Sequence, residues 1–247
     1  MKTIKDNPFK FLSVQLPAIG ALIMLVIIPL LQWAVDYQLI PTQYHAYVTG
    51  GLMAVLTYIG KKIYQPNLHQ VQNFATITAG HSNTDPGALN GKTKESELVT
   101  NFRNAVSHYL REYGVQVKND GIGSKNNPLS AAIKLISGSD VAVEFHMNAA
   151  ASKQANGVET ISLPHDKKLA QDLSAAIAAT LGSRLRGDKG WIDQSKSARG
   201  RLGYVNAGGL IVELGFISND DELARFNARY WLAAKAVAKV LAEYLKK

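Results

Sequence analysis

The 247-residue sequence contains no cysteine, and this absence narrows its chemistry. Without thiols the chain can form neither a disulfide bond nor a thiolate metal site. Any zinc ion would therefore have to be bound by histidine and carboxylate side chains.

Acidic residues are also scarce, with 19 Asp and Glu against 27 Lys and Arg, which gives a formal net charge of +8. This excess favours an acidic partner, such as nucleic acid, anionic lipid or the bacterial cell wall. The basic residues are spread along the chain and form no recognisable nucleic-acid-binding motif, so we expect no nucleic-acid partner. A basic surface that only keeps the protein soluble explains the excess as well as a wall-binding surface does.

Charge is absent from most of the first third of the chain. Residues 11–35 carry no charged side chain, a run long enough to cross a bilayer core of about 30 Å. Residues 44–63 are uncharged as far as Lys61 but only moderately hydrophobic, so an interfacial or soluble helix is the alternative there. Lysines precede the first run and follow the second, while the connector has none, which predicts a transmembrane hairpin with both ends cytoplasmic.

The composition changes again near Pro66, where a short polar stretch begins. We therefore predict a membrane segment over residues 1–65, a linker over residues 66–73 and a globular domain over residues 74–247. A cleaved signal peptide fits the first run less well, because the apolar region is long and no typical cleavage site follows it directly.

The predicted globular domain alternates strand and helix patterns. The strands are expected at residues 74–79, 115–118, 140–147, 158–163 and 210–214, and the helices at residues 95–113, 128–136, 167–181 and 230–245. Such alternation predicts an α/β fold, in which helices cover the faces of a sheet.

Several polar residues fall where the predicted strands end or a helix begins. His81, His146 and Glu213 lie at or near strand ends, and Glu95 starts the first long helix. The carboxyl ends of strands form the ligand crevice of open α/β sheets, so these residues can converge. Two imidazoles and a carboxylate can bind catalytic zinc, and a further carboxylate can accept a proton from water. Taken alone, each histidine could instead be an ordinary surface or core residue, and Glu95 could be a carboxylate that stabilises the N-terminus of its helix.

Three segments together resemble a known family. AGHSNTDPGALNGKTKESEL, VEFHMNAA and LIVELGFISNDDE are similar, in this order, to the signature blocks of the zinc-dependent N-acetylmuramoyl-L-alanine amidases of type 3, which include autolysins and phage endolysins. The resemblance implies that His81, Glu95 and His146 bind zinc and that Glu213 is the catalytic carboxylate. It also implies a twisted, mostly parallel sheet flanked by helices, and hydrolysis of the amide bond between N-acetylmuramic acid and L-alanine in peptidoglycan.

Four further residues are candidates for contact with the substrate. Asn148 follows His146 in the second block, and Arg199 and Arg201 belong to a basic loop over residues 184–206 that either holds acidic groups of the stem peptide or is merely solvated. Glu144 replaces a small residue that is common in the family. It either positions His146, alters substrate choice or faces solvent. Ser218 or Asn219 can cap a helix that starts at the acidic residues 220–222, and Asn219, in the third block, is expected to be a helix cap rather than a substrate contact.

The membrane segment resembles a small holin-like segment fused to an endolysin. Peptidoglycan and the lipid bilayer are the expected partners, and the membrane segment is a candidate for oligomerisation. We expect the protein in a bacterial inner membrane, that of the host if a phage encodes it. The domain would stay cytoplasmic until the membrane is breached, or lie on the wall side if the second run does not insert. The alternatives are a membrane-lesion protein with an accessory or inactive amidase-like domain, and a zinc peptidase with similar ligands.

Overall fold

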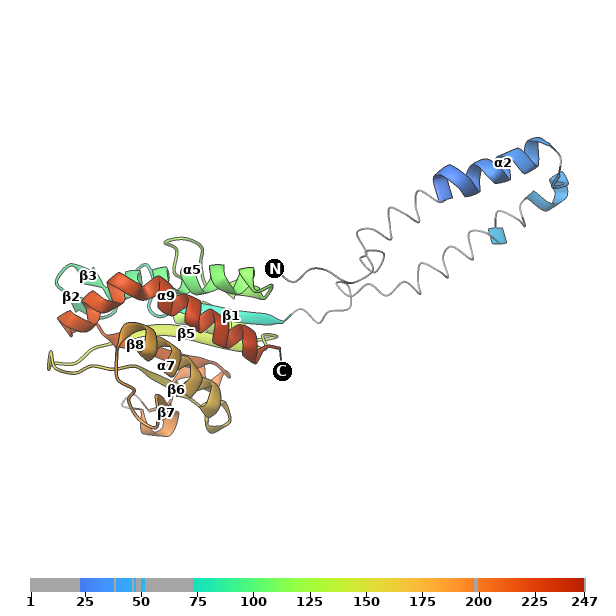
Figure 1. Cartoon of the computed structure of the whole chain (residues 1–247). Helices are drawn as coiled ribbons and strands as arrows, with labels where there is room; N and C mark the ends of the chain where they lie inside the picture. Colours follow the sequence, from blue (N-terminus) through green and yellow to red (C-terminus); the bar gives the residue numbers. More distant parts are fainter. Residues whose placement is uncertain are drawn as a thin grey trace. The chain divides into compact units, whose positions relative to one another are not determined.

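The computed structural model describes residues 23–37, 39–45, 47, 50–51, 73–197 and 200–246. The chain divides into two compact units, Met1–Val71 and Gln72–Lys247, which we describe separately. Figure 1 labels many of their elements.

The described part of the first unit is helical. A π-helix, η2 (Ile23–Ile27), leads into α2 (Ile28–Asp36), and a short 3-10 helix, η3 (Thr42–Tyr44), follows. Within the described residues, no helix combines the length and the apolar character that a membrane crossing requires. Residues 11–22 of the first predicted span and residues 52–63 of the second lie outside the described residues.

The second unit is built on a six-stranded sheet with the order β4-β1-β5-β8-β6-β7. Its strands are β1 (Phe74–Ala79), β4 (Gln116–Asn119), β5 (Val141–Asn148), β6 (Glu159–Ser162), β7 (Trp191–Asp193) and β8 (Leu210–Phe216). Strands β4, β1, β5 and β8 are mutually parallel, whereas β6 is antiparallel to β8 and β7 is parallel to β6. The predicted α/β fold with a mostly parallel sheet is therefore confirmed. A small hairpin, β2 (Leu89–Asn90) and β3 (Thr93–Lys94), lies outside this sheet.

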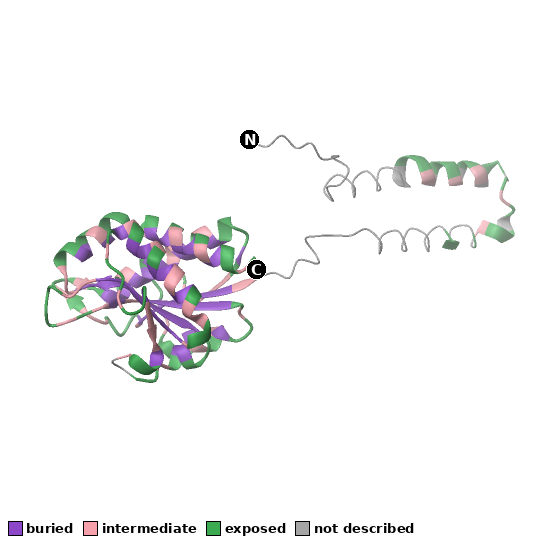
Figure 2. Ribbon diagram, turned by 60° about the horizontal axis from the view of Figure 1, so that its bottom comes forward, coloured by how far each residue is buried: buried purple, intermediate pink, exposed green. Residues whose placement is uncertain are grey.

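Helices cover the sheet, whose strands are largely buried (Figure 2). Buried apolar side chains form the core between the helices and the sheet. The long helices α5 (Glu95–Glu112), α7 (Lys167–Leu181) and α9 (Asp220–Tyr244) pack on the main hydrophobic core. The short helices α6 (Leu129–Ile136) and α8 (Gly203–Asn206) pack on a smaller core at the other face. Single-turn 3-10 helices, η4 (Pro164–Asp166) and η5 (Gln194–Lys196), complete the described elements of this unit.

Strand β5 divides its side chains between these two faces. Val143 and Phe145 belong to the main core, where the Phe145 ring packs edge-on against Phe102 of α5 with centroids 4.8 Å apart. Ala142 belongs to the smaller core. This alternation was predicted from the sequence, and it turns His146 toward the face that carries the short helices.

Helix α9 is longer than the sequence pattern indicated. It begins at Asp220, where the acidic residues predict a helix start, and continues without a break through the helix predicted over residues 230–245. The side chain of Asn219 caps it by accepting a hydrogen bond from the Glu222 N–H at 3.0 Å. The predicted cap is therefore confirmed. The three acidic residues of the first turn stabilise the N-terminus of the helix, as the sequence predicts.

A buried ion pair connects α5 with the sheet. Arg103 and Asp120 are almost completely buried, with the Arg103 Nη1 2.8 Å from Asp120 Oδ1. The other oxygen of Asp120 accepts the N–H of Ala79, the last residue of β1, at 3.2 Å. The Nδ2 of Asn126, itself a partner of Arg103, donates to the Gly80 carbonyl at 2.8 Å. The pair therefore fixes the chain where β1 ends.

We expect Arg103→Met to lower the free energy of unfolding of the purified protein by about 3–5 kcal/mol, because it leaves the Asp120 carboxylate buried and unpaired. Urea denaturation followed by circular dichroism measures this loss. Arg111→Met, on the exposed side of the same helix, is the matched control and should change the unfolding free energy by less than about 0.5 kcal/mol. Equal losses in the two variants would contradict this role for the buried pair.

Candidate metal centre

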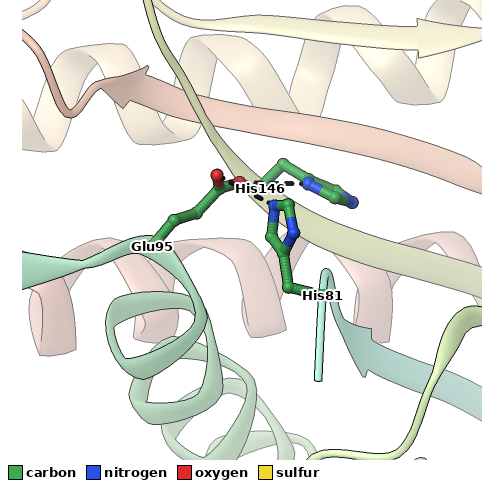
Figure 3. Close-up of side chains that lie close together, drawn as sticks. All are labelled: His81, Glu95 and His146. Carbon is green, nitrogen blue, oxygen red and sulfur yellow. Dashed lines mark hydrogen bonds and ion pairs between the residues drawn. The ribbon is translucent and has the colours of Figure 1, made fainter. Parts of the chain in front are cut away.

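Three side chains from separate elements meet at the carboxyl edge of the sheet. His81 lies two residues after the end of β1, Glu95 is the first residue of α5, and His146 lies near the end of β5. Their potential ligand atoms all lie within 4.8 Å of one another. Figure 3 shows the Glu95 carboxylate facing both imidazoles.

The Glu95 carboxylate links the two histidines. Its Oε2 lies 2.9 Å from His81 Nε2, and its Oε1 lies 3.1 Å from His146 Nδ1. The backbone N–H groups of Ala88 and Met147 donate to the same two oxygens at 3.0 and 2.9 Å. Four contacts thus hold the carboxylate in one orientation.

The contacts within this cluster shift the pKa values of Glu95 and His146 in opposite directions. Burial raises the pKa of Glu95, but its hydrogen bonds with His146 and His81 outweigh burial and hold the pKa well below the usual range. Burial lowers the pKa of His146, but its hydrogen bonds to Glu144 and Glu95 and the charge of Glu213 raise it to about 10. The surroundings therefore stabilise a cation at this point.

Two glycines leave space for the imidazoles of this cluster, because a side chain at either position would collide with one of the rings. A Cβ atom on Gly80 would lie 2.1 Å from the Cε1 of His146, and one on Gly87 would lie 2.6 Å from the Cδ2 of His81. Gly87 also has a φ of 68°, a region that glycine adopts without strain. His81 itself has a φ of 66°, which is uncommon outside glycine and is tolerated where the surroundings enforce it.

Two nitrogen ligands and one carboxylate, converging from rigid elements, match the ligand set of catalytic zinc sites. The two glycines and the excess of negative charge add to this fit. The residues present can therefore hold a divalent cation.

A second layer of carboxylates contacts the outer nitrogens of both imidazoles. Asp85 lies 2.9 Å from His81 Nδ1, and Glu144 lies 3.1 Å from His146 Nε2. Such partners fix the orientation of a ligating ring. Glu144 is only 2% exposed, and Thr78 contacts its other oxygen at 3.5 Å, so the solvent-facing alternative for this residue is wrong. Asp85 was not predicted, because an aspartate in a Pro-Gly loop is a common turn residue.

The cluster opens onto a cleft of about 680 Å³. Glu213 lines this cleft on β8, directly opposite His146 in the strand register, and Glu159 on β6 is opposite Glu213 in turn. Paired residues on neighbouring strands face the same side of a sheet. One row across three strands thus joins the candidate ligand His146 to two carboxylates.

The candidates for substrate contact do not all gather in this cleft. Asn148 lines it, and its Nδ2 donates to Glu159 Oε1 at 3.0 Å. Arg201 is exposed and is not part of the cleft lining, whereas Arg199 lies outside the described residues. Arg186, from the same basic loop, does line the cleft. Glu159 was missed because a single carboxylate near the start of a strand gives no sequence signal.

Comparison with known proteins relates this unit to one group of enzymes. The sequence profile of the N-acetylmuramoyl-L-alanine amidase family matches residues 76–243. The N-acetylmuramoyl-L-alanine amidase LytC of Bacillus subtilis (strain 168) is 25% identical over 187 residues, which cover 72% of this chain and 36% of LytC. This chain thus matches about a third of the length of that curated relative.

Solved structures show the same similarity. A crystal structure described as an N-acetylmuramoyl-L-alanine amidase from Neisseria meningitidis is 47% identical, with a TM-score of 0.67, and the match covers 70% of this chain and 96% of that one. The catalytic domain of CwlV from Bacillus (Paenibacillus) polymyxa var. colistinus is 22% identical, with a TM-score of 0.57 and coverage of 70% and 98%. The latter match shows a shared fold.

We expect the purified protein to bind one zinc ion per chain, and His81→Ala or His146→Ala to weaken binding more than roughly 100-fold. Loss of groups that merely orient a ligand already costs about 10- to 100-fold, and these variants remove a ligand itself. Metal analysis and competition with a chelator of known affinity measure the effect.

Two further variants serve as references for this measurement. Glu144→Ala should weaken binding by about 10- to 100-fold, because it removes only a partner of His146. His108→Ala removes an exposed histidine of α5 outside the cluster and should leave the affinity unchanged. Full zinc occupancy in either His81→Ala or His146→Ala would refute the ligand assignment.

Proposed function

The chain belongs to the N-acetylmuramoyl-L-alanine amidase family, and we propose that it is a zinc-dependent peptidoglycan hydrolase that cleaves the amide bond between N-acetylmuramic acid and L-alanine. The observation that carries this proposal is the convergence of His81, Glu95 and His146 in a cleft that Glu213 also lines. All four residues fall inside the segment that matches the family.

In this proposal His81 and His146 bind the metal through ring nitrogens and Glu95 binds it through its carboxylate. Bound zinc supplies a Lewis acid, which lowers the pKa of water toward 7 and polarises a carbonyl group. The carboxylates behind the two imidazoles, Asp85 and Glu144, keep the rings in the orientation that points one nitrogen of each at the cluster.

Glu213 acts as the general base and then as the general acid. It accepts a proton as the water oxygen bonds to the lactyl carbonyl carbon, and it returns that proton to the L-alanine nitrogen as the carbon–nitrogen bond breaks. Its place across from His146 in the strand register supports this role, as does its electrostatic effect on the pKa of that histidine. The row continues to Glu159, whose two oxygens are already bound by Asn148 and Arg186.

The cleft has room for a substrate of this kind. Asn148 lies near His146 on the cleft wall, and its side-chain amide donates to Glu159. The same amide can also contact the substrate. The basic side chain of Arg201 is exposed away from the cleft lining and fits contact with the wall polymer rather than with the scissile bond.

We also propose that residues 11–35 and 44–63 attach the protein to a bacterial inner membrane as a helical hairpin. The support lies in the sequence, namely the uncharged runs and the lysines that flank them. In the described part of this region, α2 leaves Leu30 and Trp33 more than half exposed, as a surface that contacts lipid would. The charge distribution supports a cytoplasmic location for the amidase domain, residues 74–247, until the membrane is breached.

The activity and the role of Glu213 are tested together on purified muropeptides. The products of amidase cleavage are a muramic acid with a free lactyl carboxylate and a peptide with a free L-alanine amine, which mass spectrometry identifies. Glu213→Gln should retain zinc and lose turnover by about 100-fold or more, as expected for removal of a general base. Near-normal turnover would exclude Glu213 from proton transfer, and loss of zinc would make it a ligand. New termini within the peptide would instead indicate a zinc peptidase.

The location of the amidase domain is tested by adding protease to intact spheroplasts that express the full chain. A hairpin with both ends inside predicts that the domain resists digestion until the membrane potential collapses. Digestion from outside before that point would replace the hairpin with a single-span anchor. A domain that is released by a salt wash, with no membrane-bound fraction, would contradict the anchor altogether.

A further inference from the structure

Arg186 is a cation in the wall of the cleft, and the backbone of two segments holds it there. The backbone around it pairs with the chain ahead of β6, since the Arg186 N–H donates to the Val158 carbonyl at 3.0 Å and the Val158 N–H donates to the Arg184 carbonyl at 2.9 Å. A Cβ atom on Gly157 would lie 2.9 Å from the Arg186 Cγ. The glycine therefore makes room for the arginine side chain to cross toward the sheet.

The contacts of the guanidinium group leave one side of it available. Its Nε donates to Glu159 Oε2 at 2.5 Å, its Nη1 approaches the Asn156 carbonyl at 3.4 Å, and the group lies 4.9 Å from the centre of the Phe216 ring. Among the residues that the structure describes, no acceptor receives a hydrogen bond from Nη2. Arginine has five N–H donors in a planar fork that suits carboxylates. This group can therefore bind an anionic ligand and keep its contacts with Glu159 and Asn156.

Charge makes this position selective. The cleft lining carries the carboxylates of Asp85, Glu95, Glu159 and Glu213, against the cations Arg186 and Lys196. Lys196 is exposed, whereas the Arg186 side chain is only 31% exposed. Arg186 therefore offers a negatively charged ligand a fixed, partly desolvated partner in this lining.

The distance from the metal cluster matches a short stretch of peptide. His146, Glu213 and Glu159 occupy one row on adjacent strands, and two strand spacings amount to about 10 Å. An extended peptide covers at most about 3.6 Å per residue, so Arg186 lies within reach of the second or third residue after a bond cleaved at the cluster.

We propose that Arg186 binds a carboxylate of the stem peptide two or three residues beyond the scissile amide bond, and that Glu159 and Asn148 hold it in place for this purpose. The proposal rests on the proposed peptidoglycan amidase function. It makes the site selective for stem peptides that carry a free carboxylate at that position over those that carry a carboxamide.

The test compares two muropeptides that differ only in a carboxylate or a carboxamide at the second or third stem residue. The wild-type protein should cleave the carboxylate form with a KM about 10- to 100-fold lower, as expected for a hydrogen bond to a charged group. In Arg186→Gln this preference should disappear through a rise in KM for the carboxylate form, with kcat and zinc content little changed. Arg186→Lys keeps the charge without the planar fork and should recover part of the preference.

Arg184→Gln is the matched control. Arg184 lies two residues before Arg186 and carries the same charge, but its side chain binds Asn156 and does not line the cleft. It should retain the full preference. An unchanged preference in Arg186→Gln, or an equal rise in KM for both substrates, would overturn the proposal, provided that circular dichroism shows the variant to be folded. If Arg186→Gln does not fold, the comparison between wild type and Arg186→Lys decides, since equal preferences would refute the role of the fork.

Binding of the free acidic stem peptide and of its carboxamide form to the zinc-loaded protein, measured by calorimetry, requires no hydrolysis. A binding preference for the carboxylate that Arg186→Gln abolishes would support the inference even if no amide bond were cleaved, in which case only the proposed activity would fail. Equal affinity of the wild-type protein for the two peptides would contradict the inference, whatever the outcome for hydrolysis.

Discussion

The carboxylate of Glu95 is the group on which the candidate centre depends. It bridges two imidazoles, one in the loop after β1 and one on β5, and two backbone N–H groups donate to the same carboxylate oxygens. Because Glu95 is also the first residue of α5, the positive end of the helix dipole stabilises its negative charge. A shift of this helix would therefore move the group that both histidines contact.

Helix α5 is fixed in turn by a buried charge. Arg103, two turns along the helix, binds Asp120, and Asp120 accepts the N–H of the last residue of β1. The helix that carries Glu95 and the strand that leads to His81 thus share one ion pair inside the core. Burial of such a pair adds little to stability compared with apolar packing, but its geometry allows few alternatives. We interpret it as the link that keeps these two candidate ligands at a constant separation.

Sequence patterns predicted the groups whose placement follows from one strand or one helix. Alternation along β5 separated His146 from the core-facing Phe145, and the carboxyl-edge rule brought His81 and Glu213 toward the same place. The contacts that the sequence did not predict are formed between two segments that lie far apart along the chain. Arg186 meets Glu159 because the chain after α7 pairs with the residues before β6, and no periodicity in either segment reports that pairing. For the same reason the short strand β7 escaped prediction, since it has three residues and exists through its pairing with β6.

The row of residues across β5, β8 and β6 explains how two similar carboxylates can serve different purposes. Glu159 has one oxygen bound by Asn148 and the other by Arg186, so accepting a proton would cost it a hydrogen bond to a cation. Glu213 is one strand closer to His146, where a proton can pass between attacking water and leaving amine. In the function that we propose, the inner carboxylate moves protons and the outer one holds the arginine that recognises the peptide. Strand spacing alone sets the distance between the bond that breaks and the charge that is recognised.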